Sequence, residues 1–318
     1  MSILADIPAS DSLTPPTGWQ LFRALASGTL KSGLAWHNPA YRHKFVLRSL
    51  LMPVSTARLL TDLAKQPDLL PMLHAQPGLP CRLHRPWLSV FMSREQTLAA
   101  LAFHYRTFAT SLPAATRLSY YAPQGLLLAE LRGKNDECYS IHLMAKAFQD
   151  KEGETTLVFC DAQQTPLAEM TFALCEYQGK RTLFIGGLQG AKANVAHDAI
   201  QFATKACHGL FPKRLLLEAG NQLATFFAIQ QVVAVSNSTH VYQSWCYRQK
   251  KQGKLFSDYD SFWCSLGGEQ NAEGVFHLPL HIVRKPMEEI ASKKRAEYRR
   301  RYQLLDALQS QISQALQG

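Results

Sequence analysis

Long apolar runs are missing from this sequence, and none approaches the ~18 uninterrupted apolar residues that a membrane-spanning helix needs. The first eleven residues also lack the basic and apolar segments of a signal peptide, and they contain Asp6 and Asp11 instead. The seven cysteines are widely spaced and form no Cys-x-x-Cys pair, which indicates reduced, mostly buried thiols. These absences predict a cytoplasmic protein that is neither exported nor inserted into a membrane.

Acidic residues are fewer than basic ones: 24 Asp and Glu stand against 34 Lys and Arg, which gives a net charge of +10. A hydrophobic content of 47% excludes a disordered or fibrous chain. The surface is therefore expected to attract anions. Several kinds of partner are negatively charged, namely phosphorylated cofactors, acidic carrier proteins, nucleic acids and anionic lipid headgroups. Charge alone therefore selects none of them.

The first part of the chain has turn signals that divide short helical patterns, which predicts a helical N-terminal region over residues 1–120. One helix is expected from Ser93 to Phe108, with Ser93 as its cap. His104 lies on or beside the apolar face of this helix. We interpret it as a hydrogen-bonded core histidine.

Runs rich in β-branched and aromatic residues follow from Gly125 onward, between turn signals. They predict antiparallel strands at Leu126 to Leu131, Tyr139 to Phe148, Thr156 to Asp161, Leu167 to Tyr177 and Arg181 to Leu188. Within the fourth run, Met170, Phe172 and Leu174 share one face, so a layer should cover that side of the sheet.

Helix and strand patterns alternate after Leu188. The sequence predicts a helix from His197 to Leu210, a short buried strand from Arg214 to Leu217, a helix capped by Asn221, and a strand from Val232 to Ser236. The fold class is therefore α/β of the α+β kind, with a mixed, mostly antiparallel sheet. This α/β domain is assigned to residues 121–285, and residues 286–318 are expected to form a basic C-terminal helix packed on it.

Three sets of motifs carry a family resemblance. They are Ile185-Gly186-Gly187-Leu188-Gln189-Gly190 with His208-Gly209-Leu210-Phe211-Pro212-Lys213, Ala234-Val235-Ser236 with His240 and Tyr242, and Tyr259-Asp260-Ser261-Phe262-Trp263 with the basic run Ser292 to Tyr302. Over roughly Trp36 to Leu308 the chain resembles the VirK/YbjX family, a bacterial group known mainly as a domain of unknown function. The resemblance implies effects on the envelope, on virulence and on tolerance of antimicrobial peptides, but it implies no reaction.

The loop after the fifth strand resembles the donor loop of GNAT-type N-acyltransferases, in which backbone N–H groups and a helix N-terminus hold pyrophosphate. The resemblance assigns donor binding to Gln189, Gly190, Ala191, Lys192, Lys205 and Lys213. It implies acyl-CoA or an acyl-carrier protein as the donor. Ala191 and Ala193 stand where a second glycine would help, and a tight turn that needs Gly190 for backbone reasons is the alternative.

His240 and Tyr242 are the candidates for proton transfer. His240 follows a strand that is expected to lie beside the loop strand, and Tyr242 is two residues further on. An imidazole accepts a proton from an attacking amine, and a phenol returns one to a leaving thiolate. Glu218 is an alternative base. The structural alternative is a histidine at a sheet edge with Tyr242 in the core.

No metal site is predicted, because His277 and His281 are four residues apart without a third ligand at zinc-type spacing. The terminal helix, in contrast, gathers cations around Tyr298 and Tyr302. These cations are Lys293, Arg295, Arg299, Arg300 and Arg301. They are candidates for binding lipid headgroups or a phosphorylated ligand, ahead of nucleic acid, and would allow peripheral association with the inner membrane. A solvated helix face is the alternative.

The leading hypothesis is an acyltransferase-like protein that moves an acyl group from a CoA or acyl-carrier donor to an amine or hydroxyl acceptor. Its main rival is a non-catalytic binding or regulatory protein on the same fold that engages an anionic ligand, a lipid headgroup or nucleic acid. From the sequence alone, both an enzyme and a binding protein remain open.

Overall fold

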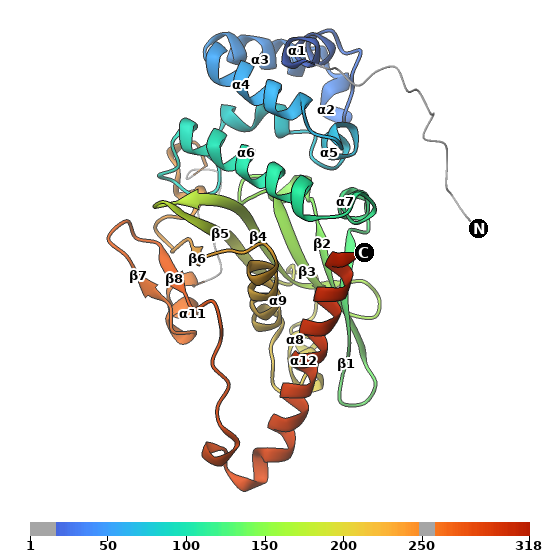
Figure 1. The fold of residues 1–318 in the computed structure, drawn as a ribbon, viewed down its shortest axis with the longest axis vertical. Helices are drawn as coiled ribbons and strands as arrows, with labels where there is room; N and C mark the ends of the chain where they lie inside the picture. Colours follow the sequence, from blue (N-terminus) through green and yellow to red (C-terminus); the bar gives the residue numbers. More distant parts are fainter. Residues whose placement is uncertain (1–16, 248–257) are drawn as a thin grey trace, which may run out of the picture.

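A computed structural model describes residues 17–247 and 258–318. Its first part is helical, as the sequence predicted (Figure 1). The helices are α1 (Gly18–Ser27), α2 (Leu34–His37), α3 (Pro39–Leu50), α4 (Pro53–Ala64), α5 (Leu69–Ala75), η1 (Leu79–His84), α6 (Arg94–Ser111) and α7 (Ala114–Tyr121). The Ser93 side chain caps α6 in a reciprocal capping box with Gln96, which confirms the predicted start of this helix.

A mixed sheet of eight strands follows, in the order β1-β2-β3-β4-β5-β6-β8-β7. The strands are β1 (Leu126–Arg132), β2 (Cys138–Met144), β3 (Thr155–Cys160), β4 (Pro166–Tyr177), β5 (Lys180–Gly190), β6 (Gln231–Ala234), β7 (Glu269–Gln270) and β8 (Phe276–Leu278). All neighbouring strands are antiparallel except β5 and β6, which are parallel with Thr182 opposite Gln231 and Ile185 opposite Ala234. The sheet confirms the predicted α/β class.

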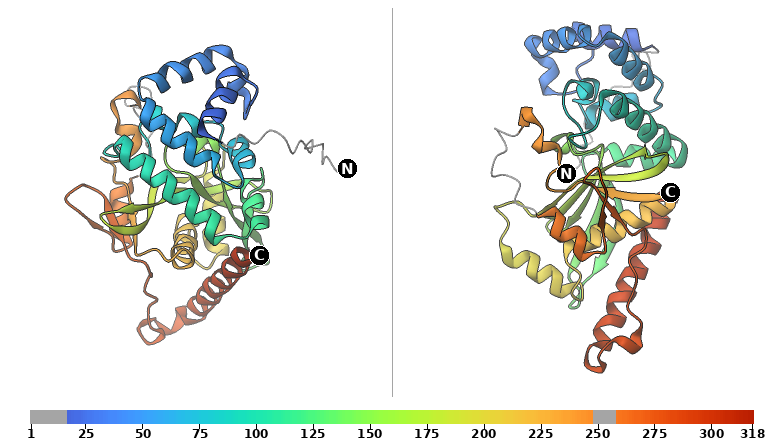
Figure 2. Two further views of the ribbon diagram at one scale, coloured as in Figure 1. Left: turned by 45° about the horizontal axis from the view of Figure 1, so that its top comes forward. Right: turned by 90° about the vertical axis from the view of Figure 1, so that its left-hand side faces the viewer.

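The remaining helices connect and cover the strands. They are η2 (Ala147–Gln149), α8 (His197–Ala206), α9 (Pro212–Phe226), η3 (Val241–Gln243), α11 (Tyr259–Ser265), η4 (Met287–Glu289), η5 (Ser292–Lys294) and α12 (Arg295–Gln317). Figure 2 shows the sheet between the N-terminal helices and the pair α9 and α12. Every helix in residues 17–247 and 258–318 is too short or too polar to span a bilayer.

The alternation of side chains along β4 explains this layering. Met170, Phe172 and Leu174 contribute to the core beneath α9 and α12, whereas Ala173 and Cys175 contribute to the core beneath the N-terminal helices. Because successive side chains of a strand point to opposite faces, one strand supplies both cores. The predicted covering layer is present, and a second layer covers the other face.

One predicted strand is wrong. Residues 214–217 lie in α9, which also contains Asn221 in its interior instead of at a helix start. Pro212 occupies the first turn, where its fixed φ suits a helix, and Leu215, Leu216, Ala219 and Leu223 are buried at helical spacing. The short apolar run Leu215 to Leu217 therefore belongs to the buried face of a helix.

A buried ion-pair network joins the N-terminal helices to the sheet. Arg82 of η1 contacts Asp150 at 2.9 Å and Glu154 at 2.7 Å, and all three residues are buried. Tyr105 of α6 donates a hydrogen bond to Glu154. Burial raises the pKa of Glu154, while Arg82 opposes that shift by a smaller amount. The connector between β2 and β3 is therefore fixed from the helical side.

Candidate functional site

The same connector carries a second buried carboxylate, Glu152, on which the candidate site is centred. Gln189, at the end of β5, donates from Nε2 to the two carboxylate oxygens of Glu152 at 2.9 and 3.0 Å. The Tyr242 hydroxyl is hydrogen-bonded to the same carboxylate. His240 Nε2 lies 3.6 Å from Glu152 Oε1. We call Glu152, Gln189, His240, Tyr242 and the neighbouring Tyr259 the Glu152 centre.

Two glycines of β5 make room for Glu152. A Cβ on Gly187 would lie 2.1 Å from Glu152 Oε2, and a Cβ on Gly186 would lie 2.0 Å from the Glu152 carbonyl oxygen. Both distances are far shorter than any real contact. The Gly186-Gly187 pair is thus required by the close approach of the connector, and the carboxylate occupies the space that a side chain on Gly187 would fill.

The turn after β6 orients His240. The Ser236 amide donates to Thr239 Oγ1 at 2.8 Å, and the Tyr242 amide donates to His240 Nδ1 at 3.2 Å. Because Nδ1 accepts a hydrogen bond from the Tyr242 amide, the neutral imidazole carries its proton on Nε2, which faces Glu152. The ring is fully buried. His240 Nε2 faces Glu152 at 3.6 Å without forming a hydrogen bond, and the burial of the ring keeps it from solvent.

Two tyrosines complete the centre. The Tyr259 ring stacks on His240 with centroids 5.4 Å apart, and its hydroxyl accepts the Leu188 amide at 3.2 Å. Burial, followed by the nearby Glu152 charge, raises the pKa of both Tyr242 and Tyr259. Both phenols therefore keep their protons at neutral pH. Tyr242 is half-buried, so it is the phenol of the centre that solvent reaches.

The centre surrounds a buried carboxylate with neutral donors and one histidine. In the described part of the chain, no Lys or Arg forms an ion pair with Glu152. Burying a carboxylate is costly for stability unless donors compensate it, and here the donors are a neutral amide and a phenol. The arrangement can accept a proton at Glu152 and donate one from Tyr242 along their shared hydrogen bond.

The other predicted donor-loop residues lie outside this centre. Gly190 ends β5, and a Cβ on it would meet only Lys213 Cε at 3.8 Å, so packing does not require glycine there. Its φ is also outside the left-handed region, which removes the backbone reason for a glycine. Ala191 is half-buried and Lys192 exposed. Lys213, at the start of α9, lies over the Phe262 ring, and burial lowers its pKa.

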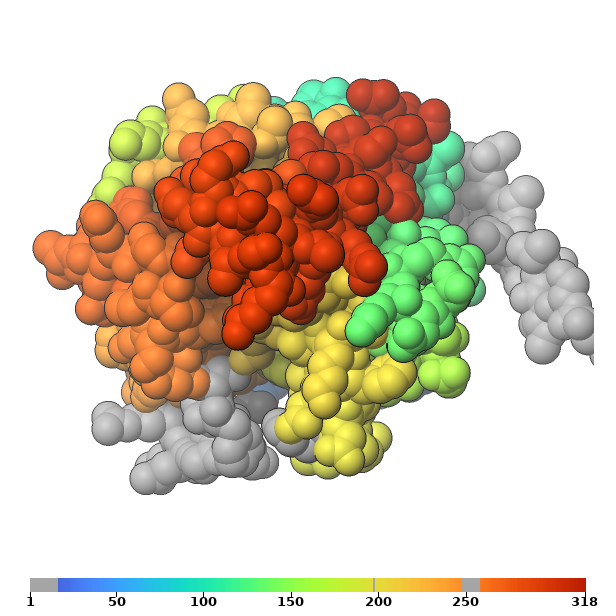
Figure 3. Space-filling view, turned by 90° about the horizontal axis from the view of Figure 1, so that it is seen from below, coloured from blue at the N-terminus to red at the C-terminus, as the bar shows by residue number. Residues whose placement is uncertain are grey.

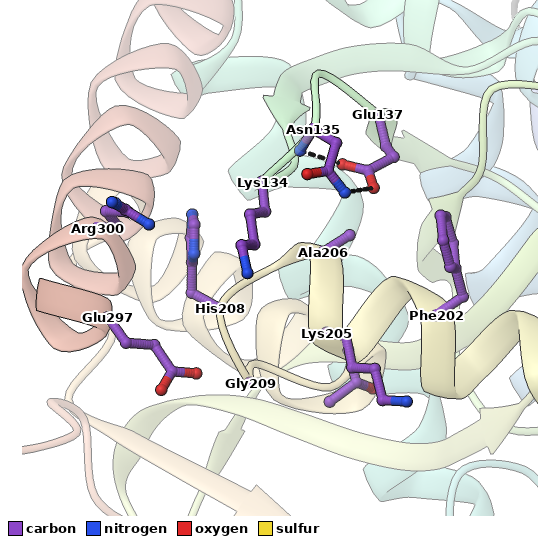
Figure 4. A pocket seen from close by; sticks show the side chains of 11 residues that line it. Lys134, Asn135, Glu137, Phe202, Lys205, Ala206, His208, Gly209, Glu297 and Arg300 are labelled. Carbon is purple, nitrogen blue, oxygen red and sulfur yellow. Dashed lines mark hydrogen bonds between the residues drawn. The ribbon is translucent and has the colours of Figure 1, made fainter. Parts of the chain in front are cut away.

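Lys205 and Arg300 line a cavity of about 520 Å³, at the opposite end of α8 from the donor loop. The β1–β2 turn, α8 and the start of α12 meet on this face (Figure 3). The close-up shows Lys134, His208 and Arg300 together on one side (Figure 4). Glu137 and Glu297 also line the cavity, so its charge is mixed.

Some basic residues of the terminal region are engaged within the chain. Arg301 donates to the His208 carbonyl at 2.8 Å and lies over Tyr298, and Arg295 donates to the Ile290 carbonyl at 3.0 Å. Lys293 and Arg299 are exposed. Two of the five predicted cations therefore bind backbone of this chain, and anion binding by the remainder stays a prediction.

Glu218 is not brought to His240. It lies on α9, where Arg214 pairs with it at 3.0 Å, and it lines a separate cavity beside α12. The prediction placed it at the end of a strand, and the helical course of residues 212–226 explains its different position. His277 hydrogen-bonds Asn271, and no group of three or more metal-type ligands occurs among the described residues.

Sequence reasoning missed Glu152 and the role of Tyr259. Residues 150–154 read as a polar, solvent-exposed turn because they contain three acids and a glycine. The usable signal was the Gly186-Gly187 pair inside an apolar strand, since adjacent glycines in a strand mark a close approach of another group.

Comparison with known proteins places this chain in a family. The model for "Protein of unknown function (DUF535)" matches residues 35–314. The chain belongs to the DUF535 family. The "Uncharacterized protein YbjX" of Escherichia coli K12 is 50% identical over 298 residues, which are 94% of this chain and 90% of that protein. An uncharacterized protein of Haemophilus influenzae is 37% identical over 132 residues, 42% of this chain and 43% of that protein.

The resemblance to the VirK/YbjX family is thereby confirmed. All members of the Glu152 centre fall within the residues that the DUF535 model matches. None of the matching names states an activity.

Proposed function

We propose that this DUF535 protein is an acyltransferase that uses the Glu152 centre for proton transfer. The observation that carries the proposal is the Glu152 carboxylate itself, which is fully buried, has no Lys or Arg partner among the described residues and is hydrogen-bonded to the half-buried Tyr242. A buried carboxylate with a structural role is normally paired with a cation, as Glu154 is with Arg82.

The proton route follows from the hydrogen bonds. The acceptor nitrogen or oxygen forms a bond to the thioester carbonyl carbon while the carbon–sulfur bond breaks. The acceptor's proton passes to the half-buried Tyr242 hydroxyl while that hydroxyl gives its own proton to the buried Glu152, and the departing sulfur then takes a proton from Tyr242. The Tyr242–Glu152 hydrogen bond returns a proton to the phenol, so both groups end in their starting states. Gln189 holds the carboxylate in position, and the buried His240 ring lies beside it.

Donor binding is supported by the end of β5. Gly190 has neither a packing nor a backbone reason to be glycine in this structure, and an approaching phosphate group supplies one. Lys213 stands beside it and provides positive charge. The loop connects a strand to α8 and directly follows Gln189, which itself binds Glu152. A CoA or acyl-carrier thioester bound there would bring its reacting end toward the Glu152 centre.

The full burial of His240 and Glu152 favours a second candidate, a protein that binds an acyl carrier or a phosphorylated ligand without reaction. In that case the Glu152 centre recognises a donor group on the ligand. The two functions differ in turnover but share ligand binding.

The test measures acyl transfer and ligand binding on the same preparations. Short- and long-chain acyl-CoA and acyl-carrier protein are incubated with a small-molecule extract of bacterial envelopes, and acylated products are detected by mass spectrometry. Released CoA should not be followed with a thiol reagent, because the exposed Cys138 and Cys264 would react with it too. Glu152→Gln is expected to lower turnover by ~10²- to 10⁴-fold, because a positioned general base contributes that much. Ligand-induced thermal shifts should persist.

Matched controls separate chemistry from folding. Glu218→Gln changes a half-buried carboxylate away from the centre and should keep wild-type turnover. Tyr242→Phe should lower turnover, whereas Tyr247→Phe, which alters a ring 5.9 Å from Tyr242, should not. Product formation by folded Glu152→Gln at the wild-type rate would exclude this mechanism. Thermal shifts without product from the wild type would favour the binding protein.

A further inference from the structure

Four large apolar side chains are exposed together where α3 turns into α4. Leu47, Leu50, Leu51 and Val54 expose 63, 66, 81 and 71% of their surface. Leu47 and Leu50 lie in the last turn of α3, Leu51 is its C-cap, and Val54 follows in the first turn of α4. We call these four residues the apolar tip. Figures 1 and 2 show that α3 and α4 lie at the end of the molecule opposite the start of α12.

The fold does not use the apolar tip. The inward face of α3 is formed by Phe45 and Ser49, and that of α4 by Leu59, Leu60 and Leu63, all of which are buried. The tip is thus additional apolar surface, next to a core that is already complete. Contiguous exposed patches of this kind mark sites of interaction.

The charge around the tip has one sign. Residues 17–61 contain six Lys or Arg and no Asp or Glu. Lys44 and Arg48 lie on α3 one turn before tip residues, and Arg58 lies on α4 one turn after Val54. In the described part of the chain no ion pair engages these three cations. Lys44 and Arg58 are exposed and therefore available to an external anion, whereas Arg48 is half-buried and lies near Cys81 and His84.

We propose that the apolar tip inserts into the surface of an anionic lipid bilayer, with Lys44 and Arg58 contacting the lipid phosphates. Leucine side chains at the tip would enter the boundary between headgroups and acyl chains, while each nearby cation adds electrostatic attraction to anionic lipid. Residues 17–61 contain no Asp or Glu, which favours an anionic bilayer as the partner because lipid phosphates would repel an acidic side chain. A second copy of the chain would bring the same cations together and is disfavoured.

This proposal does not depend on the acyltransferase proposal. It moves the membrane contact from the terminal helix, where Arg295 and Arg301 are bound to backbone carbonyls, to the helical end of the molecule. Bound in this way, the protein would hold the start of α12 and its mixed-charge cavity away from the lipid.

The test is flotation of the full chain with vesicles. Vesicles of phosphatidylethanolamine with phosphatidylglycerol should bind the wild type, and vesicles of phosphatidylcholine alone should bind it weakly. Leu50→Ser with Leu51→Ser should lower binding at least about 10-fold, because two exposed leucines lose their transfer into the acyl region. Lys44→Gln with Arg58→Gln should lower it about 10- to 30-fold at low salt, and high salt should reproduce that loss in the wild type.

Two control variants remove equivalent groups elsewhere. Leu118→Ser with Val283→Ser changes two other exposed apolar residues, and Arg299→Gln with Arg300→Gln removes two cations of α12. Both should bind vesicles as the wild type does. Unchanged binding by the tip variants, or equal loss in the controls, would overturn the proposal. A wild type that ignores anionic vesicles but whose molecular mass in solution falls on tip substitution would show a self-association surface instead.

Discussion

Glu152 and Glu154 are two residues apart in one connector, and both are fully buried, yet the protein treats them in opposite ways. Glu154 turns toward the N-terminal helices, where Arg82 and Tyr105 meet it. Glu152 turns toward β5 and the turn after β6, where it finds an amide, a phenol and an imidazole. Glu154 is paired with Arg82 and forms a structural junction. Glu152 has no Lys or Arg partner among the described residues, which leaves its carboxylate available for chemistry.

The largest expected effect comes from breaking the structural half of this comparison. Arg82→Met leaves Asp150 and Glu154 buried without their cation. The unfolding free energy should fall by about 3 to 5 kcal/mol, because a buried charge without its partner is no longer compensated for its loss of water. Urea unfolding should show this loss. Arg85→Met, at an exposed position three residues on, should change the unfolding free energy by less than about 0.5 kcal/mol. Equal stability of the two variants would mean that Arg82 does not hold the junction.

Most of the fold could be predicted because its strands carry clear local patterns. Each predicted run from Leu126 to Leu188 contains a strand, although the second ends at Met144 and Phe148 lies in η2, and Ser93 caps α6 as expected. His104 is a core histidine with Nδ1 accepting the Leu174 amide and Nε2 beside Thr155. The short run at residues 214–217 failed because three consecutive leucines fit a buried strand and a buried helix equally well.

The candidate site was predicted only in part, for a physical reason. His240, Tyr242 and Gln189 follow or end apolar strands, so the chain pattern indicates that they approach each other. Glu152 comes from a connector whose composition indicates solvent exposure. Its burial depends on partners 37 or more residues distant in sequence, which no local pattern contains.

A smaller effect should come from the space around Glu152. Gly187→Ala places a methyl group where the Glu152 carboxylate lies and is expected to cost about 1 to 3 kcal/mol, as overpacking does in a closed core. Gly190→Ala, three residues further along, has room for its Cβ and should stay within about 0.5 kcal/mol of wild type. Thermal and urea unfolding check both variants. If Gly187→Ala were as stable as Gly190→Ala, the carboxylate would not be confined against the strand.

The smallest effect on stability is expected at Glu152 itself. Glu152→Gln removes a buried charge that has no Lys or Arg partner among the described residues, and it keeps the shape of the side chain. The unfolding free energy should therefore stay within about 1 kcal/mol of wild type or rise, as is common when a functional site is neutralised. Glu154→Gln should instead lower it, because Arg82 then keeps only Asp150 as a buried anion. Both variants are compared by urea unfolding under one set of conditions. A loss at Glu152→Gln as large as that of Arg82→Met would make Glu152 a second structural carboxylate and would remove the main argument for proton transfer at this centre.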